Sequence, residues 1–237
     1  MSLEVVGIIP ARGGSKGIPR KNIAPLAGRP LIAWTIQAVQ VSLHMNRVIV
    51  STEDEEIARI AKQSGADVPF LRPTELAQDD TPGMAPILHA VKWLEKNEGY
   101  VPDLIMCLQP TSPLRSSEDI DAAIELAERT NADAVVSVMP VDHHPDWMRC
   151  VDNDGRLSDF RTDDHPATRR QDLLPVYALN GAIYLGCRTV LLEQESWYTD
   201  KTYAYIMPPE RSLDIDTQWH LYLADLVLKD KVNYEDC

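Results

Sequence analysis

The chain has 237 residues, enough for one large α/β domain with its own core, and 36 acidic against 23 basic residues give a formal net charge of −13. A surface this negative argues against a general binder of nucleic acid or anionic membranes, and no apolar run approaches the roughly 18 residues of a membrane-spanning helix. The four cysteines lie far apart without a CxxC pair, which favours reduced thiols in a cytoplasmic protein over a zinc site or disulfide framework.

Strands and helices are predicted to alternate along most of the chain. Short apolar runs indicate buried strands, and apolar residues recurring every three or four positions indicate helices. In chain order, these patterns predict a strand at 4–10, a helix at 30–42, a strand at 47–52, helices at 53–65 and 86–97, a strand at 103–109, a helix at 117–130, strands at 133–141, 176–186 and 203–209, and a helix at 217–230. This alternation predicts an α/β fold with a mostly parallel sheet and helices on both faces.

Three helices carry finer signals. Pro30 is expected at the first helical position of 30–42, and Ser117 is expected to cap 117–130. The first of these helices is predicted to bury Leu31, Trp34, Ala38 and Val41 on one face. The closing helix is predicted to place Trp219, Leu223, Leu226 and Val227 on one side.

Residues 142–176 interrupt the alternation. They are polar, rich in turn-forming residues and without a clear period. An inserted arm, a lid or an oligomer contact would each fit this composition. The sequence contains no internal repeat and no clear linker, so we expect a single domain over 1–237 with this insertion inside it.

A basic loop follows the first predicted strand. The stretch IIPARGGSKGIPRKN, residues 8–22, places Arg12, Lys16, Arg20 and Lys21 within ten residues that contain no acid. Ligands of open α/β sheets bind beyond the carboxyl ends of the strands, where this loop lies. Glycines at 13, 14 and 17 permit positive φ and close approach of backbone N–H groups to an anion. The loop therefore predicts a polyphosphate site, with a solvated basic loop as the alternative, although no Walker A loop or GxGxxG fingerprint occurs.

The same stretch closely resembles the signature of the acylneuraminate cytidylyltransferases, also called CMP-sialic acid synthetases. Later segments agree with this family in order: STEDEEIA, LRPTELAQDDT, LQPTSPLR, HHP, RRQDLLPVYALNGAIYLG and SLDIDTQWHL. The resemblance runs from about residue 5 to 225 and so covers nearly the whole chain.

The resemblance implies a Rossmann-like nucleotidyltransferase fold and an enzyme that joins CMP from CTP to the anomeric hydroxyl of a sialic-acid-like, nine-carbon 2-keto sugar acid. The expected cofactor is Mg²⁺, and the expected second product is pyrophosphate. The resemblance also implies that residues 142–176 form a dimerisation arm that packs on the second subunit of a homodimer. CTP, the sugar acid and a second copy of the chain are thus the expected partners.

The nucleotide site is assigned by matching motif positions. Arg12 and Lys21 match the family's triphosphate-binding positions and are expected to be catalytic, with Arg12 on the leaving phosphates and Lys21 near the α/β bridge. The other nucleotide positions are Gly13, Gly14, Asn22 and Thr81. Segment 78–83 matches the family segment that reads cytosine, but Pro82 and Gly83 replace the expected Ser/Thr run. Lys16 and Arg20 are each either phosphate ligands or solvated surface charges.

Asp214 and Asp216 form the candidate metal site. In an extended segment, side chains two apart point the same way, and hard carboxylate oxygens suit Mg²⁺. In an acidic chain such a pair is weak evidence by itself, and it is the resemblance that assigns both residues to the metal. Asp216 or a metal-bound water is the candidate general base.

The sugar acid is assigned to a second group of residues. The resemblance places Gln109, Asn180 and Gly181 at the sugar and gives Arg170 the sugar's carboxylate. Gln109 has an alternative role in tying down the following turn, and Asn-Gly between apolar residues is also a hairpin-turn signal.

Tyr184 is a further sugar-site candidate. With Trp197 and Tyr198 it forms either an apolar wall for the sugar or part of the core.

Segment 142–148, which matches the family's dimer arm, bears on metal binding and on substrate choice. His143 and His144 are adjacent and would point apart in a strand, so a structural or interface role is favoured over a metal site. Asp146 and Trp147 stand where sialic acid enzymes often carry a lysine, which leaves room for acids such as legionaminic acid.

Two further hypotheses differ from CMP transfer to a sialic acid. One keeps the chemistry but uses GTP or another keto-deoxy sugar acid. The other is a nucleotide-binding regulatory protein without catalysis, against which the intact Arg12, Lys21, Asp214 and Asp216 argue.

Overall fold

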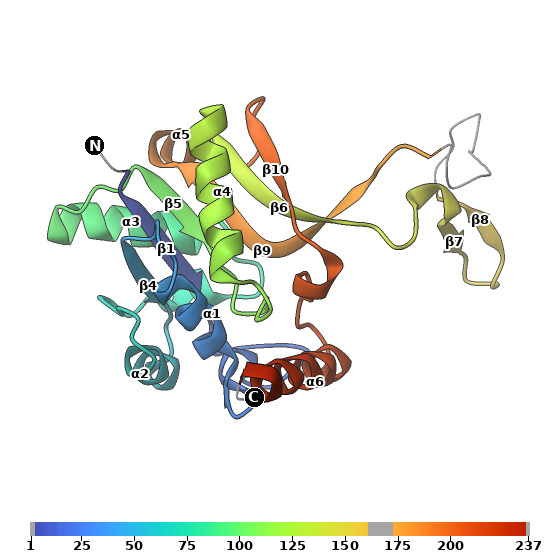
Figure 1. Cartoon of the computed structure of the whole chain (residues 1–237), viewed down its shortest axis with the longest axis horizontal. Coiled ribbons are helices and arrows are strands. Elements are labelled where there is room, and N and C mark those ends of the chain that lie inside the picture. Colours follow the sequence, from blue (N-terminus) through green and yellow to red (C-terminus); the bar gives the residue numbers. More distant parts are fainter. Residues whose placement is uncertain (1–2, 161–172, 236–237) are drawn as a thin grey trace.

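A computed structural model describes residues 3–160 and 173–235 of the chain and contains a six-stranded sheet (Figure 1). The strand order is β10-β6-β9-β5-β1-β4. The strands are β1 (Val5–Pro10), β4 (Arg47–Ser51), β5 (Leu104–Cys107), β6 (Ala134–Pro140), β9 (Tyr177–Cys187) and β10 (Thr202–Ile206). All of them run in one direction except β9, which pairs antiparallel with both β5 and β6. The prediction of a mostly parallel α/β sheet is confirmed.

Helices cover both faces of the sheet. One face carries α1 (Leu31–Gln40), α2 (Glu55–Gln63) and α4 (Ser117–Thr130), and the other carries α3 (Ala85–Glu98) and α5 (Arg188–Gln194). Strand β1 shows why both faces are needed. Val5 and Ile9 are buried with the first group of helices, whereas Val6 and Ile8 are buried with the second. An apolar run without polar alternation is therefore stable only between two helical layers.

A third apolar cluster joins the first loop to the end of the chain. Ile18, Leu26 and Leu31 pack with Ile215 and with Leu228 of α6 (Gln218–Glu235). Two short paired strands, β2 (Pro25–Leu26) and β3 (Arg29–Pro30), shape this corner together with the 3₁₀ turn η1 (Lys21–Ile23). Burial of Ile18 and Ile215 in one cluster brings the basic loop next to the segment that carries Asp214 and Asp216.

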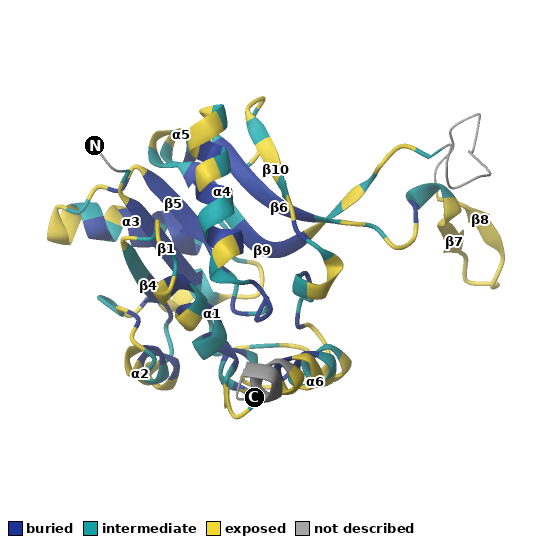
Figure 2. Cartoon of the chain, viewed as in Figure 1, coloured by how far each residue is buried: buried dark blue, intermediate teal, exposed yellow. Residues whose placement is uncertain are grey.

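The insertion between β6 and β9 extends away from the sheet (Figure 1). It contains the turn η3 (Pro145–Trp147) and a hairpin of β7 (Arg149–Val151) and β8 (Leu157–Asp159), which is exposed along its whole length (Figure 2). His144 fastens its base: Nδ1 accepts a hydrogen bond from Asp146 N, so Nε2 carries the proton and donates to Leu174 O at 3.1 Å. The second histidine is thus used inside the arm itself.

Several local predictions are corrected by the packing. The N-cap of α4 is Ser116, whose side chain exchanges hydrogen bonds with the Asp119 main chain and carboxylate, so Ser117 is already helical. Pro30 is the N-cap of α1 and not its first residue.

The predicted faces of two helices also need correction. Helix α1 buries Leu31 as predicted, and Trp34 and Ala38 are partly buried, but Val41 is exposed. The main core is contacted by the unpredicted Ile32, Ile36 and Val39. On α6 the buried residues are Ala224 and Leu228, and the expected apolar side is exposed at Trp219, Leu226 and Val227.

No helix within the described ranges combines the length and apolar content needed to cross a bilayer. Cys107, Cys150 and Cys187 are free thiols, and Cys237 lies outside the described residues.

Candidate active site

A cavity of about 500 Å³ opens beyond the carboxyl ends of β1 and β5. Its wall is built from four stretches of chain, within residues 10–22, 72–86, 107–111 and 214–216. Of the predicted site residues, it is lined by Arg12, Gly14, Lys21, Asn22, Thr81, Gln109, Asp214 and Asp216. Its volume is that of a typical pocket for a small organic ligand.

Two loop cations meet one carboxylate across the cavity. Arg12 Nη1 lies 2.7 Å from Asp79 Oδ1, and Lys16 Nζ lies 3.0 Å from Asp79 Oδ2. These hydrogen bonds, that of Lys16 first, lower the pKa of Asp79. The carboxylate thus stays ionised and neutralises part of the basic loop. Both cations line the cavity, whereas Arg20 pairs with Asp54 and Glu56 of the α2 N-terminus, outside it.

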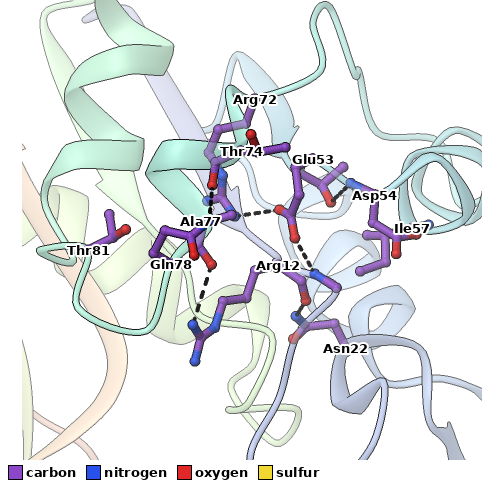
Figure 3. A network of polar contacts seen from close by, with 12 residues as sticks. Arg12, Asn22, Glu53, Asp54, Ile57, Arg72, Thr74, Ala77, Gln78 and Thr81 are labelled. Carbon is purple, nitrogen blue, oxygen red and sulfur yellow. Dashed lines mark hydrogen bonds and ion pairs between the residues drawn. The ribbon is translucent and has the colours of Figure 1, made fainter.

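A buried ion pair supports the loop from behind (Figure 3). Arg72 Nη2 donates to Glu53 Oε2 at 2.9 Å, and Glu53 Oε1 accepts from Gly13 N at 2.7 Å. The amide of Asn22 donates to Arg12 O at 2.9 Å. The Gly13 N–H and the Asn22 amide therefore fix the shape of the loop from within the protein, while the Arg12 side chain points into the cavity.

The loop glycines serve close packing. A Cβ on Gly13 would lie 2.6 Å from Asp54 Oδ2, and one on Gly17 would lie 2.5 Å from the main-chain oxygen of Asp216, so a larger residue would displace a side chain at 13 and the backbone at 17. Glycine permits positive φ at 13, 14 and 17, but none of these residues adopts it, whereas Arg20, at φ 52°, does. Gly17 in particular lets the basic loop touch the acidic segment.

Lys21 joins the two halves of the site directly. Its Nζ donates to Ile215 O at 2.8 Å and to Asp216 Oδ1 at 3.1 Å. The side chain is largely buried, whereas that of Asp216 is 65% exposed. A cation is thereby fixed beside the carboxylate pair at the floor of the basic loop.

Asp214 is the less ordinary of the two carboxylates. Its Oδ1 is buried and has no hydrogen-bond partner among the described residues. Burial raises the pKa of Asp214, as does the charge of Asp216, while a hydrogen bond from Thr111 and the charge of Lys21 oppose the rise. A buried acceptor left unpaired costs free energy unless a cation binds it.

The donor set fits a magnesium ion. Both carboxylates line the cavity, and an unpaired carboxylate oxygen is the hard ligand that Mg²⁺ prefers. In the described part of the chain no cluster of three or more His, Cys, Asp or Glu is arranged to hold a metal. Asp214 and Asp216 would therefore share the ion with waters and substrate phosphates, as Mg²⁺ sites commonly do.

The side chain of Gln109 lines the cavity and does not tie down the following turn. Its backbone carbonyl, which accepts from Ser112 N and from Arg115 Nη1, is the group that ties the following turn. Arg115 is buried and also donates to Ala182 O and Thr35 Oγ1, so it anchors the turn to the sheet. The side chain that lines the cavity is thus held on a rigid base.

Four predicted residues do not line the cavity. Gly13 lies behind the cavity wall, where its N–H bonds to Glu53. Asn180 is buried, and its side chain forms hydrogen bonds with Ser137 and Ser212. Gly181 stands just outside, since a Cβ there would lie 2.8 Å from Gln109 Oε1 and 3.6 Å from Asp214 Oδ2. The hairpin alternative for Asn180-Gly181 is wrong because both lie within strand β9. The fourth residue is Tyr184.

Tyr184 packs beside the cavity floor. Its ring lies 5.8 Å from that of Trp197, and both contact the core cluster under α3 and α5. Burial raises the pKa of Tyr184 to about 12. Arg170 lies outside the described residues, so its role stays a prediction.

Two charged cavity residues were missed by the sequence analysis. Arg72 and Asp79 both line the cavity, yet each is a charged loop residue to which no motif assigned a role. The available signal was their place in the LRPTELAQDDT segment, in which only Thr81 was assigned a role.

Removing the Asp79 charge is expected to improve nucleotide binding. The Asp79→Asn variant should lower the KM for a nucleoside triphosphate by about two- to five-fold, because Arg12 and Lys16 would no longer be held by an exposed carboxylate. Initial rates at varied nucleotide concentration measure the change. Asp80→Asn, at a neighbouring acid that does not line the cavity, is the matched control. A KM equal to or above that of the unaltered protein would contradict the competing role of Asp79.

Known sequences resemble the chain over nearly its full length. The sequence model of the family described as cytidylyltransferase matches residues 6–227. A CMP-N,N'-diacetyllegionaminic acid synthase of Legionella pneumophila is 36% identical over 222 residues, which cover 91% of this chain and 92% of that protein. An N-acylneuraminate cytidylyltransferase of Streptococcus agalactiae is 35% identical over 98% of this chain, which spans only 56% of that longer relative.

Among solved structures, the fold is similar to that of a CMP:2-keto-3-deoxy-manno-octonic acid synthetase complexed with CTP. The TM-score is 0.72, and the match covers 96% of this chain and 99% of the other at 16% identity. The likeness supports the same arrangement of sheet and helices.

Proposed function

The chain belongs to the cytidylyltransferase family, and from that premise we propose that it transfers CMP from CTP to the anomeric hydroxyl of a sialic-acid-like, nine-carbon 2-keto sugar acid. Pyrophosphate is the second product. One observation carries the proposal: a basic loop and a carboxylate pair, joined by Lys21, line the same cavity. Cations for a polyphosphate and ligands for its metal are thus adjacent.

The reaction needs positioning and charge neutralisation more than covalent chemistry. The sugar hydroxyl attacks the α-phosphorus as the bond to pyrophosphate breaks. Arg12, with its planar fork of donors, is suited to the leaving phosphates, and Lys21 supplies a fixed charge beside the reacting centre. Asn22 contributes by holding the carbonyl of Arg12, which keeps that side chain aimed into the cavity.

Asp214 and Asp216 are the proposed holders of Mg²⁺. When bound, the ion would neutralise phosphate charge and polarise the phosphoryl group. Asp216, which is exposed and adjacent to Lys21, is also the candidate acceptor for the proton of the sugar hydroxyl. Lys21 lowers the cost of placing two carboxylates together by pairing with one of them.

The identity of the sugar-acid acceptor is proposed from the named relatives and from the residues at the edge of the cavity. The curated relatives are named for diacetyllegionaminic acid and for N-acylneuraminate, which are acids of one chemical class. The Gln109 side chain faces the cavity, and the Gly181 main chain lies against that side chain. Both are therefore placed near a polar sugar bound in the cavity. No observation favours GTP over CTP.

A substrate panel tests the function. The protein, Mg²⁺ and either CTP or GTP would be incubated with N-acetylneuraminate, diacetyllegionaminate or 2-keto-3-deoxy-manno-octonate, and pyrophosphate release measured. We expect release with CTP and one of the nine-carbon acids. Equal or greater release with GTP, or release without any acceptor, would overturn cytidylyl transfer, and a preference for the eight-carbon acid would overturn the proposed acceptor.

We also propose that the arm assembles a homodimer. The β7–β8 hairpin exposes a cross-strand apolar pair, Val151 at 67% and Leu157 at 71%, and every residue of its two strands is exposed. Isolated apolar hairpins are marginal in water, so this surface is expected to be covered by a second copy.

Charge on the hairpin should separate the subunits. The Val151→Lys/Leu157→Lys variant is expected to sediment as a monomer at micromolar concentration, where the unaltered protein sediments as a dimer. Leu43→Lys, at an apolar residue exposed elsewhere, is the control and should remain dimeric. A double variant that stays dimeric would show that the hairpin is not the contact.

We place the protein in the cytoplasm. Cys150 is exposed and unpaired, a state that reducing compartments preserve, and CTP is a cytoplasmic substrate.

A further inference from the structure

Strand β9 departs from regular pairing where it passes Ser137. Val136 pairs with Tyr184 and Val138 pairs with Leu179, so residues 180–183 face the single residue Ser137. The Ser137 hydroxyl replaces the missing ladder partner by accepting from Ile183 N at 2.7 Å. The resulting bulge carries Gly181 at φ 70°, where a Cβ would lie 2.8 Å from Oε1 of the cavity residue Gln109.

A directed chain of hydrogen bonds leaves this bulge. Ser137 Oγ donates to Asn180 Oδ1 at 2.6 Å, Asn180 Nδ2 donates to Ser212 Oγ at 3.0 Å, and Ser212 Oγ donates to Pro208 O at 2.8 Å. All three side chains are buried. These hydrogen bonds link the middle of the sheet to the segment that leads to the proposed metal ligands Asp214 and Asp216.

The amide of Asn180 is fully used within the protein. Besides Ser212, Nδ2 contacts Met207 Sδ at 3.2 Å, and Oδ1 also accepts from Ala182 N at 3.2 Å. The backbone donor at Ala182 fixes which end of the amide is oxygen. No hydrogen of this side chain is left for a sugar substrate.

A second clamp holds the same segment from its other side. In the turn η5 (Pro209–Arg211), Arg211 forms two hydrogen bonds of 2.8 Å with the buried carboxylate of Asp119, which also accepts from Tyr205. Between the two carboxylates, Ile215 N donates to Thr111 O at 2.8 Å. Between these fixed points, Ser212 is the buried contact two residues before Asp214.

We propose that Asn180 is a positioning residue for the metal site: acting through Ser212, it sets the place of the Asp214 carboxylate. The inference rests on the proposed function, because it takes Asp214 and Asp216 to be the magnesium ligands. Partners that orient metal-binding carboxylates commonly change metal affinity by about 10- to 100-fold when removed. A shift of the 212–214 backbone would move the unpaired Oδ1 of Asp214 directly.

Two alanine variants test the relay, and neither residue lines the cavity. Asn180→Ala removes the whole amide. Ser212→Ala removes only the hydroxyl that accepts from Asn180 and donates to Pro208 O, so it is the second test if Asn180→Ala folds poorly. Val91→Ala, which removes buried methyl groups from α3 and leaves a cavity in the core, is the control for a loss of stability alone.

The primary readout is metal binding without turnover. Mn²⁺ alone would be titrated into each variant, with free Mn²⁺ counted by electron paramagnetic resonance. Both relay variants are expected to bind it about 10-fold more weakly than the unaltered protein, and Val91→Ala equally well. In the assay, the Mg²⁺ concentration for half-maximal rate should rise to the same extent, while the KM for the sugar acid at saturating Mg²⁺ stays unchanged.

Two results would overturn the proposal. Unchanged Mn²⁺ binding in both folded relay variants would leave Asn180 a purely structural residue. A raised KM for the sugar acid with a normal metal requirement would make it a substrate contact. If the unaltered protein releases no pyrophosphate with any substrate, the proposed function fails, and the Mn²⁺ titration still decides whether Asn180 positions the carboxylates.

Discussion

Asp214→Asn is expected to reduce turnover by about 10³-fold, because an amide oxygen is a much weaker ligand for Mg²⁺ than a carboxylate in a phosphoryl-transfer site. The fold should survive the change, since asparagine has the same shape and the replaced Oδ1 makes no hydrogen bond in the described structure.

The same substitution should not lower stability at neutral pH. Burial raises the pKa of Asp214 in the folded state above its ordinary value of 3.8, so the ionised form opposes folding. The stability that a raised carboxyl pKa contributes is present below the unfolded value and is lost as pH rises through the folded one. The variant should therefore be at least as stable as the unaltered protein at pH 7, and the difference should shrink toward pH 4.

Pyrophosphate release and thermal unfolding at several pH values measure both effects. Glu210→Gln, at an exposed acid four residues earlier, is the control and should retain turnover. Normal turnover in Asp214→Asn would remove the residue from the metal site, and a large loss of stability at pH 7 would contradict the unfavourable burial of its charge.

Arg12→Ala is expected to raise the KM for CTP by about 100-fold. The guanidinium faces the cavity and, like Lys16, contacts Asp79, and charge-assisted bonds to phosphate are among the strongest polar contacts. Loss of the side chain would also free Asp79 to repel the triphosphate.

The loop offers a matched control for this second prediction. Arg20→Ala removes an arginine from the same loop, but one whose partners are Asp54 and Glu56 outside the cavity. Binding of CTP, measured by equilibrium titration without a sugar acceptor, should weaken in Arg12→Ala and stay nearly normal in Arg20→Ala. Equal effects of the two changes would mean that the loop attracts nucleotides only through its overall charge.

The sheet was predictable because its central strands are apolar on both faces. Val5 through Ile9 carry that signal without help from distant residues, and Pro10 marks the end of the run. The direction of β9 was not predictable, since an antiparallel strand buried on both faces gives the same apolar run. The face of α6 and part of the face of α1 were assigned wrongly because neither helix packs on the sheet alone. The corner around Leu31 and Leu228 depends on loops that have no periodicity.

The charged part of the site was also predictable. A basic, glycine-rich loop and an LDID pair are local patterns, and the structure brings Arg12, Lys21, Asp214 and Asp216 to one cavity. The part that escaped depends on tertiary contacts. The hydrogen bonds of the Asn180 side chain to Ser137 and Ser212 join residues 43 and 32 positions away in sequence, so no local pattern predicts them.

Asp79 gives the resting enzyme an internal counterion. A tethered carboxylate competes at a high effective concentration, so a singly charged solute such as chloride gains little by replacing it. A ligand that contacts several loop cations at once can replace it and still gain. The carboxylate lowers the affinity of the cavity for every anion. It lowers the affinity for singly charged anions most, and so favours polyanions over the simple salts that surround the protein.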